Sequence, residues 1–184
     1  MKKDTIVQFV GFVTNLKLND FIPKWEGYAQ KLKGKNTESF LQQHSGETKN
    51  KFKYISQHEW NDADFDFTFM NERKSDNFPD HTVRVIQAGG YIPLQIQRKR
   101  HKENGDIKIV AFVGHDEREM NFYTELSPLY SNLNIYQAYY ESCLYSHVLE
   151  FFVKESKFEE LMHQLKQRPG VETGVYKDCL VAAV

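Results

Sequence analysis

The sequence predicts an α+β protein made of two consecutive halves, each with the element order β-α-β-β-α-β. The tripeptide Phe-Val-Gly occurs at 9–11 and again at 112–114, each time at the end of an apolar run that precedes a helical pattern. A short apolar run that holds one acidic residue follows in each half, FDFTF at 65–69 and LEFFV at 149–153. Aromatic residues make up 14% of the chain, and many fall in short extended runs, which favours a sheet-rich core.

The second half shows this order most clearly. Apolar and β-branched residues at 106–114 predict a buried first strand. The helical spacing at 115–130 predicts a helix whose apolar stripe includes Leu126 and Leu129. Residues 134–153 then indicate two strands around a turn.

The best helix pattern of the chain lies at 155–170. Ser156 and Glu159 have the spacing of a capping box, and Pro169 with Gly170 would end the helix. A final strand is expected after it. The predicted apolar stripe of this helix consists of Phe158, Leu161, Met162 and Leu165.

The first half repeats the order less clearly. We expect a strand at 4–13 and a helix at 19–35, and we interpret 37–50 as a polar insertion with at most a short helix. The segment where a second helix should stand, 73–81, is short for one. The remaining strands are predicted at 51–60, at 64–72 and from 82 to 100, with a break at Gly89-Gly90.

The order β-α-β-β-α-β is that of the ferredoxin-like unit. A chain with two such units resembles the α+β-barrel superfamily, in which two antiparallel sheets pack face to face. The resemblance implies two tandem ferredoxin-like halves, 1–102 and 103–184, in one compact, pseudo-symmetric α+β barrel. Members of that superfamily include cofactor-independent monooxygenases, haem-binding chlorite-dismutase-like and dye-decolorising proteins, and ligand sensors, so the fold does not select a function.

One hairpin signal does not fit the ideal unit. Asn104-Gly105 stands between two extended runs, which is typical of a tight β-turn. A hairpin there would pair 91–102 with 106–113. Either the linker strand replaces an expected partner, or the turn joins strands that soon diverge.

Composition excludes several classes of function. The 24 basic and 25 acidic residues give a net charge of -1, which provides no general attraction to nucleic acid or to an anionic membrane. No apolar run approaches the length of a membrane span. Cys143 and Cys179 lack the spacing of a metal site, and no export signal is evident, so we expect reduced thiols, a cytoplasmic protein and no bound metal.

Five polar residues are candidates for a ligand pocket. Strand alternation predicts that Asp66 and Glu150 point away from the helices, toward the interior between the sheets, where burial would make them proton donors or acceptors. His115 lies at a strand end beside a helix start, His58 lies in a strand, and Tyr139 belongs to a tyrosine-rich hairpin. The alternative for each is an ordinary structural role.

Three hypotheses on function follow. The first is that the barrel interior binds a small apolar or aromatic ligand, with cofactor-independent monooxygenase-like chemistry as its catalytic form. The second is a non-enzymatic, homo-oligomeric or regulatory protein, such as a homodimer formed through an exposed sheet. The third is haem binding through His115 or another histidine.

Overall fold

The computed structural model describes residues 5–31, 36–45, 52–61, 82–96, 106–116 and 122–182. These residues form a mixed α+β fold with the elements β1 (Thr5–Thr14), α1 (Leu18–Lys31), β2 (Asn36–His44), β3 (Tyr54–Asn61), β4 (Val83–Ile96), β5 (Ile107–Val113), α4 (Phe122–Leu126), β6 (Leu133–Ala138), β7 (His147–Val153), α5 (Glu155–Lys166) and β8 (Val171–Ala182). Hydrogen bonds join the strands in the closed-barrel order β1-β3-β2-β8-β5-β7-β6-β4.

The chain divides into two compact units. The first unit holds 1–43, 51–90 and 178–184, and the second holds 44–50 and 91–177. The boundary predicted at 102 falls outside the described residues and stays a prediction. None of the helices in the described ranges combines the length and the apolar character that crossing a bilayer requires.

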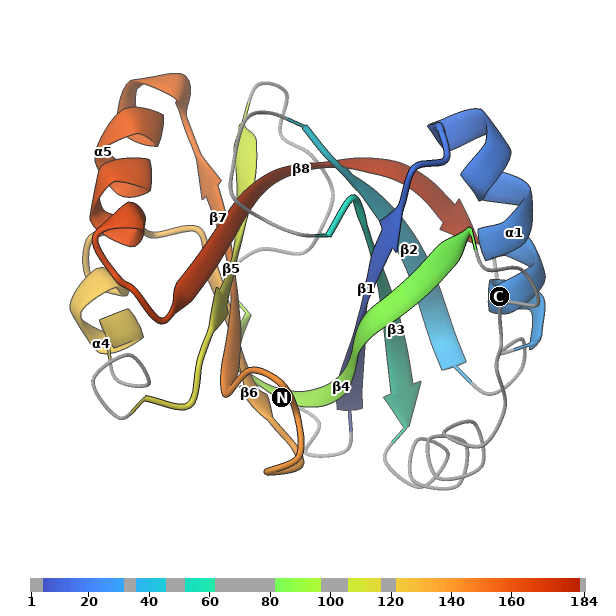
Figure 1. Ribbon diagram of the computed structural model, residues 1–184. Helices are drawn as coiled ribbons and strands as arrows, with labels where there is room; N and C mark the ends of the chain where they lie inside the picture. Colours follow the sequence, from blue (N-terminus) through green and yellow to red (C-terminus); the bar gives the residue numbers. More distant parts are fainter. Residues whose placement is uncertain are drawn as a thin grey trace. The chain divides into compact units, whose positions relative to one another are not determined.

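In the first unit, β3 lies between β1 and β2 and pairs with both in antiparallel fashion. Helix α1 covers one face of these strands (Figure 1). Its aromatic residues pack on the strands: Phe21 stacks on Tyr54 at a centroid distance of 4.2 Å, and Tyr28 meets the ring of His58 edge-on at 5.5 Å. Aromatic side chains of this size supply a large share of a small core's stabilisation.

The opposite face of the same strands carries aromatic rings together with buried glutamines. Phe9 and Phe40 flank Gln57 across the three strands, since both are its register partners. Gly11 lies two residues along β1, where the ring of Phe52 occupies the space of a side chain. A Cβ at Gly11 would lie 2.6 Å from that ring, so the close packing requires glycine.

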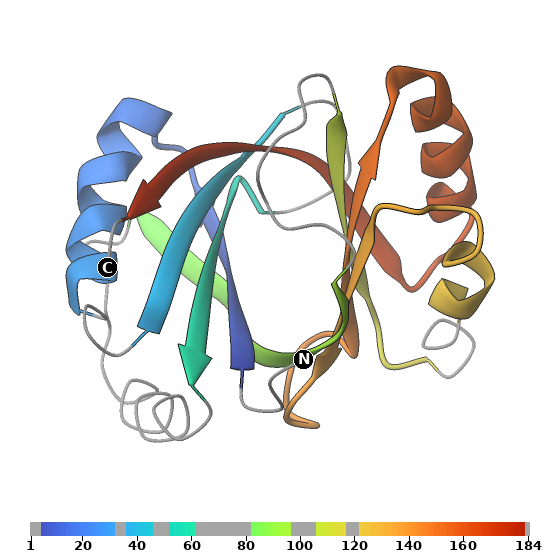
Figure 2. The same cartoon turned by 180° about the vertical axis from the view of Figure 1, so that it is seen from behind.

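In the second unit, β5 pairs with both β7 and β8, and β6 pairs with β7. Helices α4 and α5 cover one face of this sheet (Figures 1 and 2). The order β5-α4-β6-β7-α5-β8 confirms the order predicted for the second half. The core beneath the helices is built from Ile109, Ala111, Val113, Leu126, Tyr130, Leu133, Ile135, Leu149, Phe151, Val153, Leu161, Met162 and Leu165.

The interpretation of 37–50 as a polar insertion was wrong, because Asn36–His44 forms strand β2. The helix-facing side of β2 carries Ser39, whose hydroxyl lies 2.8 Å from His58 Nδ1. The other side carries the buried Gln42 beside Phe40. Polar residues occupy buried positions here, so the apolar alternation that marks a half-buried strand is missing.

Two predictions for the helices were also wrong. Helix α5 begins at Glu155 after an N-cap at Lys154, and no side chain caps it, so Ser156 and Glu159 do not form a capping box. Leu129 lies beyond the end of α4 and is 65% exposed, because the helix ends at Leu126 and the stripe ends with it.

Strand β4 is continuous through Gly89-Gly90, where the sequence predicts a break, and its register shifts at Pro93/Gln95 instead. Its second part pairs with β6, whereas β5 pairs with β7 and β8. The linker strand therefore replaces neither partner of β5, so the first of the two alternatives for the hairpin was wrong; the turn at Asn104-Gly105 lies outside the described residues. Residues 64–72 lie outside the described ranges.

The two Phe-Val-Gly tripeptides differ in one respect from the prediction. Gly114 follows the end of β5, but β1 continues past Gly11 to Thr14. Phe9 and Phe112 both lie on the strand face away from the helices. Their register partners are Gln57 for Phe9 and Glu172 for Phe112. This agreement is compatible with a duplication, which stays a prediction.

Candidate functional site

The second unit carries a polar and aromatic sheet face on the side away from α4 and α5. Alternation along β5 and β7 places Lys108 and Glu150 there, opposite the core residues Ile109 and Leu149. This is the side on which the sequence places Glu150. Its predicted counterpart, Asp66, lies outside the described residues.

Glu150 is the centre of a buried hydrogen-bond network. Its side chain is 0% exposed, and its Oε1 lies 2.9 Å from the Lys108 ammonium, which is 7% exposed. Its Oε2 accepts hydrogen bonds from the Tyr136 hydroxyl at 2.8 Å and from Asn134 Nδ2 at 3.3 Å. Asn134 is the register partner of Glu150 on β6, so three neighbouring strands each contribute to the network.

A buried ion pair rarely adds net stability over apolar residues of the same size. Removing two charges from water costs several kcal/mol per ion, which the mutual attraction offsets only with good geometry and further hydrogen bonds. Between described residues, the further hydrogen bonds here reach only Glu150 Oε2, from Tyr136 and Asn134, and a hydrophobic pair would stabilise the sheet face at least equally well. Such a group is therefore a candidate for a functional site.

Aromatic rings surround the ion pair. The Lys108 ammonium lies 5.6 Å from the centre of the Phe152 ring, and Phe152 is its register partner on β7. Tyr176, its register partner on β8, is buried. We name this surface the Lys108–Glu150 face; its members are Lys108, Asn134, Tyr136, Glu150, Phe152 and Tyr176.

Tyr176 on this face, and Tyr145, whose charge acts on it, are both held in the neutral form. Burial raises the pKa of Tyr176 well above its ordinary value, and the charges of Tyr145 and Glu172 raise it further. Burial also raises the pKa of Tyr145, with the charge of Glu172 and a hydrogen bond to it adding to the effect. The Tyr145 ring packs 5.0 Å from Phe112. Both phenols therefore keep the proton that a hydrogen-bond donor needs at neutral pH.

His44, which no sequence pattern predicted as a site residue, ends β2 and contacts this face. Its ring lies 5.3 Å from that of Tyr176, edge to face. Burial lowers the pKa of His44, so its ring is neutral at neutral pH and keeps a nitrogen lone pair. Ser45 N donates to Val175 O at 2.7 Å and ties this end of β2 to β8. No motif marks His44, since it lies in the segment interpreted as an insertion.

His58 lies on a different surface, beneath α1 in the first unit. Its Nδ1 is 2.8 Å from Ser39 Oγ and its Nε2 is 2.6 Å from Ser56 Oγ. The Trp25 indole donates to the same Ser56 hydroxyl at 2.8 Å. His58 is fully buried in this chain of hydrogen bonds, which links α1 to β2 and β3.

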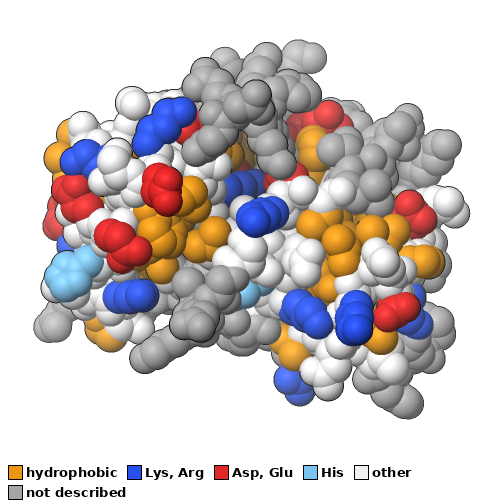
Figure 3. Space-filling model, turned by 90° about the horizontal axis from the view of Figure 1, so that it is seen from above, with side chains coloured by type: hydrophobic (Ala, Val, Ile, Leu, Met, Phe, Trp, Pro, Cys, Tyr) orange, Lys and Arg blue, Asp and Glu red, His pale blue; other side chains and the backbone are white. Residues whose placement is uncertain are grey.

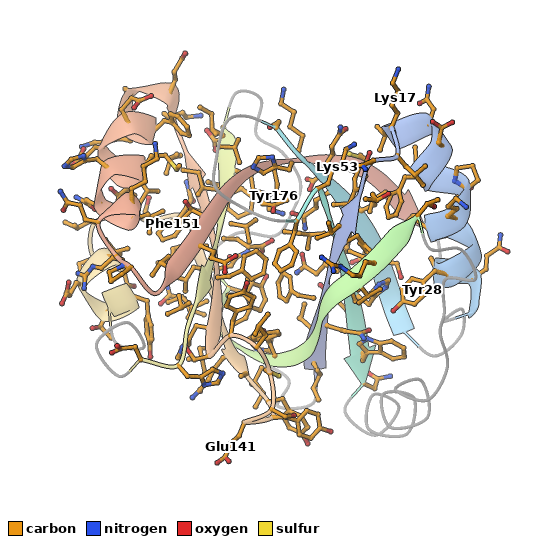
Figure 4. The ribbon with its side chains drawn as sticks, viewed as in Figure 1. Lys17, Tyr28, Lys53, Glu141, Phe151 and Tyr176 are labelled. Atoms are coloured by element: carbon orange, nitrogen blue, oxygen red, sulfur yellow. The ribbon has the colours of Figure 1, made fainter. Side chains whose placement is uncertain are left out.

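The other candidates lie near the β6–β7 connection. His115 is exposed, and its Nε2–H donates to Cys143 O at 2.7 Å. Tyr139 is half-buried and packs edge-on against Tyr140 at 4.6 Å. Neither belongs to the Lys108–Glu150 face as defined. Glu141 projects from the tip of the connection (Figure 4). Pocket roles for these residues stay predictions.

Basic, acidic and hydrophobic side chains are interspersed on the face seen in Figure 3. Within the described ranges, no three His, Cys, Asp or Glu residues are grouped in a way that would hold a metal ion. Cys143 is buried and Cys179 is half-buried, and neither forms a disulfide bond within the described ranges.

Solved structures with the same fold give the comparison with known proteins. An anthrone oxidase-like protein superposes with a TM-score of 0.67 at 8% identity, covering 99% of this chain and 94% of that one. A single-site variant of chlorite dismutase from Candidatus Nitrospira defluvii gives 0.59 at 10% identity, covering 96% and 93%. The same enzyme in complex with imidazole gives 0.55 at 10% identity, covering 96% and 92%.

No family model matches the sequence, and no curated protein matches it either. At these low identities the structural likeness shows the fold alone. It confirms the expected resemblance to ferredoxin-like α+β barrels at that level. The tandem arrangement of halves, the homodimer and the cytoplasmic location stay predictions.

Proposed function

We propose that this protein binds a small aromatic ligand with an acidic oxygen or carbon through the Lys108–Glu150 face. The observation that carries the proposal is the buried ion pair, 2.9 Å between Lys108 Nζ and Glu150 Oε1, within a surface of aromatic side chains. An ammonium attracts the oxyanion of such a ligand, and aromatic rings favour its planar body. The tyrosine hydroxyls supply further donors.

Binding of an oxyanion would change the chemistry of Glu150. The Lys108 ammonium would then interact with two anions, the Glu150 carboxylate and the ligand. The carboxylate would lose part of the interaction that stabilises its charged form. Glu150 would then be a better proton acceptor in the complex than in the free protein. This coupling assigns positioning to Lys108 and proton transfer to Glu150.

The reaction class that this supports is oxidation by dioxygen without a cofactor. One structural neighbour is an anthrone oxidase-like protein, and an anthrone has an acidic methylene group between two aromatic rings. Glu150 would take a proton from that carbon, and Lys108 would stabilise the resulting oxyanion. Dioxygen is the oxidant: one of its oxygen atoms becomes the carbonyl oxygen on the former methylene carbon, and the other leaves as water with the two hydrogens of that carbon.

The test uses anthrone as the probe, with thermal shift for binding and an oxygen electrode for turnover. We expect wild-type protein to be stabilised by anthrone and to consume oxygen. Glu150→Gln should keep binding and lose oxygen uptake, because an amide cannot accept the proton. The double variant Lys108→Met/Glu150→Met should lose both, and Lys157→Met, at an exposed position, should lose neither. An equal thermal shift in wild type and the double variant would refute the proposal.

Haem binding is a second candidate, favoured by the fold shared with chlorite dismutase and by His44. A neutral imidazole is a suitable iron ligand, and His44 stands edge-on to Tyr176 on the Lys108–Glu150 face. These residues fit the group: His44 would hold the iron, and the Lys108 ammonium would attract a propionate. Bound haem would supply redox chemistry at iron.

Titration with haemin tests this candidate by the position of the Soret band. A band that shifts in wild type and His115→Ala but not in His44→Ala would assign the ligand to His44. The reverse pattern would assign it to His115, whose Nε2 already donates to Cys143 O. A spectrum equal to that of free haemin would remove haem from consideration.

A further inference from the structure

The first unit contains a second polar group that the proposed function does not use. Gln57 of β3 and Gln42 of β2 lie on the sheet face away from α1, and both side chains are 0% exposed. Gln57 stands between its register partners Phe9 and Phe40. Gln42 pairs in register with Ile55, two residues before Gln57, so the two amides are diagonal neighbours across the strands.

A single hydrogen bond joins the two amides. Gln42 Nε2 donates to Gln57 Oε1 at 3.1 Å. Two further atoms, Gln42 Oε1 and Gln57 Nε2, are buried and have no hydrogen-bond partner in the described part of the chain. One is an acceptor and the other is a donor.

This result does not depend on the orientation of the amides. If both groups rotated by 180°, Gln57 would donate to Gln42, and Gln42 Nε2 with Gln57 Oε1 would then stand without partners. In either arrangement, one donor and one acceptor stay unsatisfied on neighbouring side chains. Burying such groups without partners is unfavourable, and native proteins seldom do it without cause.

The surroundings of the two amides are apolar and aromatic. Phe9 and Phe40 flank Gln57, and the Phe52 ring covers Gly11, the register partner of Ile55. Planar groups pack well against such rings. The face therefore combines flat apolar contacts with one donor and one acceptor at neighbouring positions.

We infer that Gln42 and Gln57 form a binding site for a planar cyclic amide, or for a ring with the same adjacent N–H donor and C=O acceptor. The ligand N–H would donate to one glutamine oxygen, and the ligand carbonyl would accept from the other glutamine nitrogen. Both buried groups would thereby be satisfied at once. The inference is independent of the Lys108–Glu150 face, because it rests on residues of the first unit.

A single buried water is the competing occupant. Buried waters make about three hydrogen bonds on average, and the two glutamines offer two. A water would also make the amides part of the fold, so that replacing them would destabilise the protein. A ligand site predicts the opposite for the free protein, because leucine at both positions removes two unsatisfied polar groups.

The test uses 2-quinolone, a flat lactam, as the probe, and N-methyl-2-quinolone, which lacks the N–H donor, as its control. We expect isothermal titration calorimetry to show binding of 2-quinolone and binding of the methylated compound weaker by about tenfold or more. Gln42→Leu/Gln57→Leu should abolish binding while its melting temperature is equal to or above that of wild type. Gln43→Leu, on the same strand with its side chain on the opposite face, should bind as wild type does.

Three outcomes would overturn the inference. They are equal affinity for the two quinolones, retained binding in the double leucine variant, and no binding by wild type with a lower melting temperature in that variant. The last outcome would assign the amides to a structural water. The Lys108→Met/Glu150→Met variant should still bind 2-quinolone, so failure of the proposed function leaves this result unchanged.

Discussion

Lys108 contacts Glu150 diagonally across two neighbouring strands. The register partner of Lys108 on β7 is Phe152, and Glu150 lies two residues before Phe152. The diagonal contact explains why both charges can be buried together. Each ion has its partner on the neighbouring strand, and the Phe152 ring lies 5.6 Å from the ammonium. Removing one of the two charges should therefore destabilise the second unit more than removing both.

We expect Lys108→Met to destabilise the protein by about 3–5 kcal/mol, because it leaves the Glu150 carboxylate buried without its counter-ion. The double variant Lys108→Met/Glu150→Met should recover most of that loss. Urea denaturation measures both. Lys157→Met breaks a solvent-exposed pair with Glu160, which water screens, so its free energy of unfolding should stay close to that of wild type. Equal losses in the single and double variants would contradict this account.

The hydrogen-bonded chain beneath α1 gives a second prediction. His58→Leu removes one partner from each of the buried Ser39 and Ser56 hydroxyls, which should cost about 1–3 kcal/mol. The emission of Trp25, which donates to Ser56, should shift in the same variant. His163→Leu, at an exposed position on α5, should stay within about 0.5 kcal/mol of wild type. An unchanged emission spectrum would show that these hydrogen bonds do not fix the position of the Trp25 indole.

His147 should make stability depend on pH. Burial, and next the charge of His115, lower the pKa of His147 from 6.5 to about 4 in the folded protein. Between these values the unfolded chain binds more protons, so the free energy of unfolding should fall as the pH decreases from about 6.5 to about 4. The Ser146 hydroxyl at 3.1 Å and the Tyr123 ring at 5.0 Å complete its surroundings.

The loss should amount to at most about 3 kcal/mol. The fall in the free energy of unfolding between pH 7 and pH 4.5 should be smaller in His147→Leu than in wild type. In His163→Leu it should equal that of wild type. An NMR titration of the His147 ring with a midpoint near its ordinary value would contradict the prediction.

Two glycines give a matched pair of substitutions. Gly11→Ala should destabilise the protein by about 1–3 kcal/mol, since the new Cβ would meet the Phe52 ring at 2.6 Å. Gly27→Ala, inside α1 with nothing within 4 Å of the added Cβ, should instead stabilise it by about 0.5–1 kcal/mol. Thermal unfolding of the two variants should therefore move in opposite directions. A higher melting temperature in Gly11→Ala would show that the Phe52 ring can move away from the added Cβ without cost.

The second half was predictable because its periodic patterns coincide with its packing. The α5 stripe is buried at Leu161, Met162 and Leu165, as its spacing indicates. Alternation along β7 also places Glu150 on the correct side of the strand. Local capping was not predictable from spacing alone, since α5 begins before the residues that have the capping-box pattern.

The strands of the first half were harder to predict, because polar side chains are buried at positions where alternation predicts apolar ones. Ser39, Gln42 and His58 are all buried, and their hydrogen-bond partners are distant in sequence. A strand with such residues looks like a surface segment until its neighbours are known. His44 was missed for the same reason, because its position depends on the strand that was not predicted.

The contact between Gly11 and Phe52 has a consequence for the evolution of this sequence. A side chain at position 11 and a large ring at position 52 exclude each other, so drift at one position is constrained by the other. Among homologues, the two columns should co-vary: a larger residue at the first should accompany a smaller one at the second. At identities as low as those of the fold neighbours, this compensated pair would help to align distant relatives when the rest of the sequence has diverged.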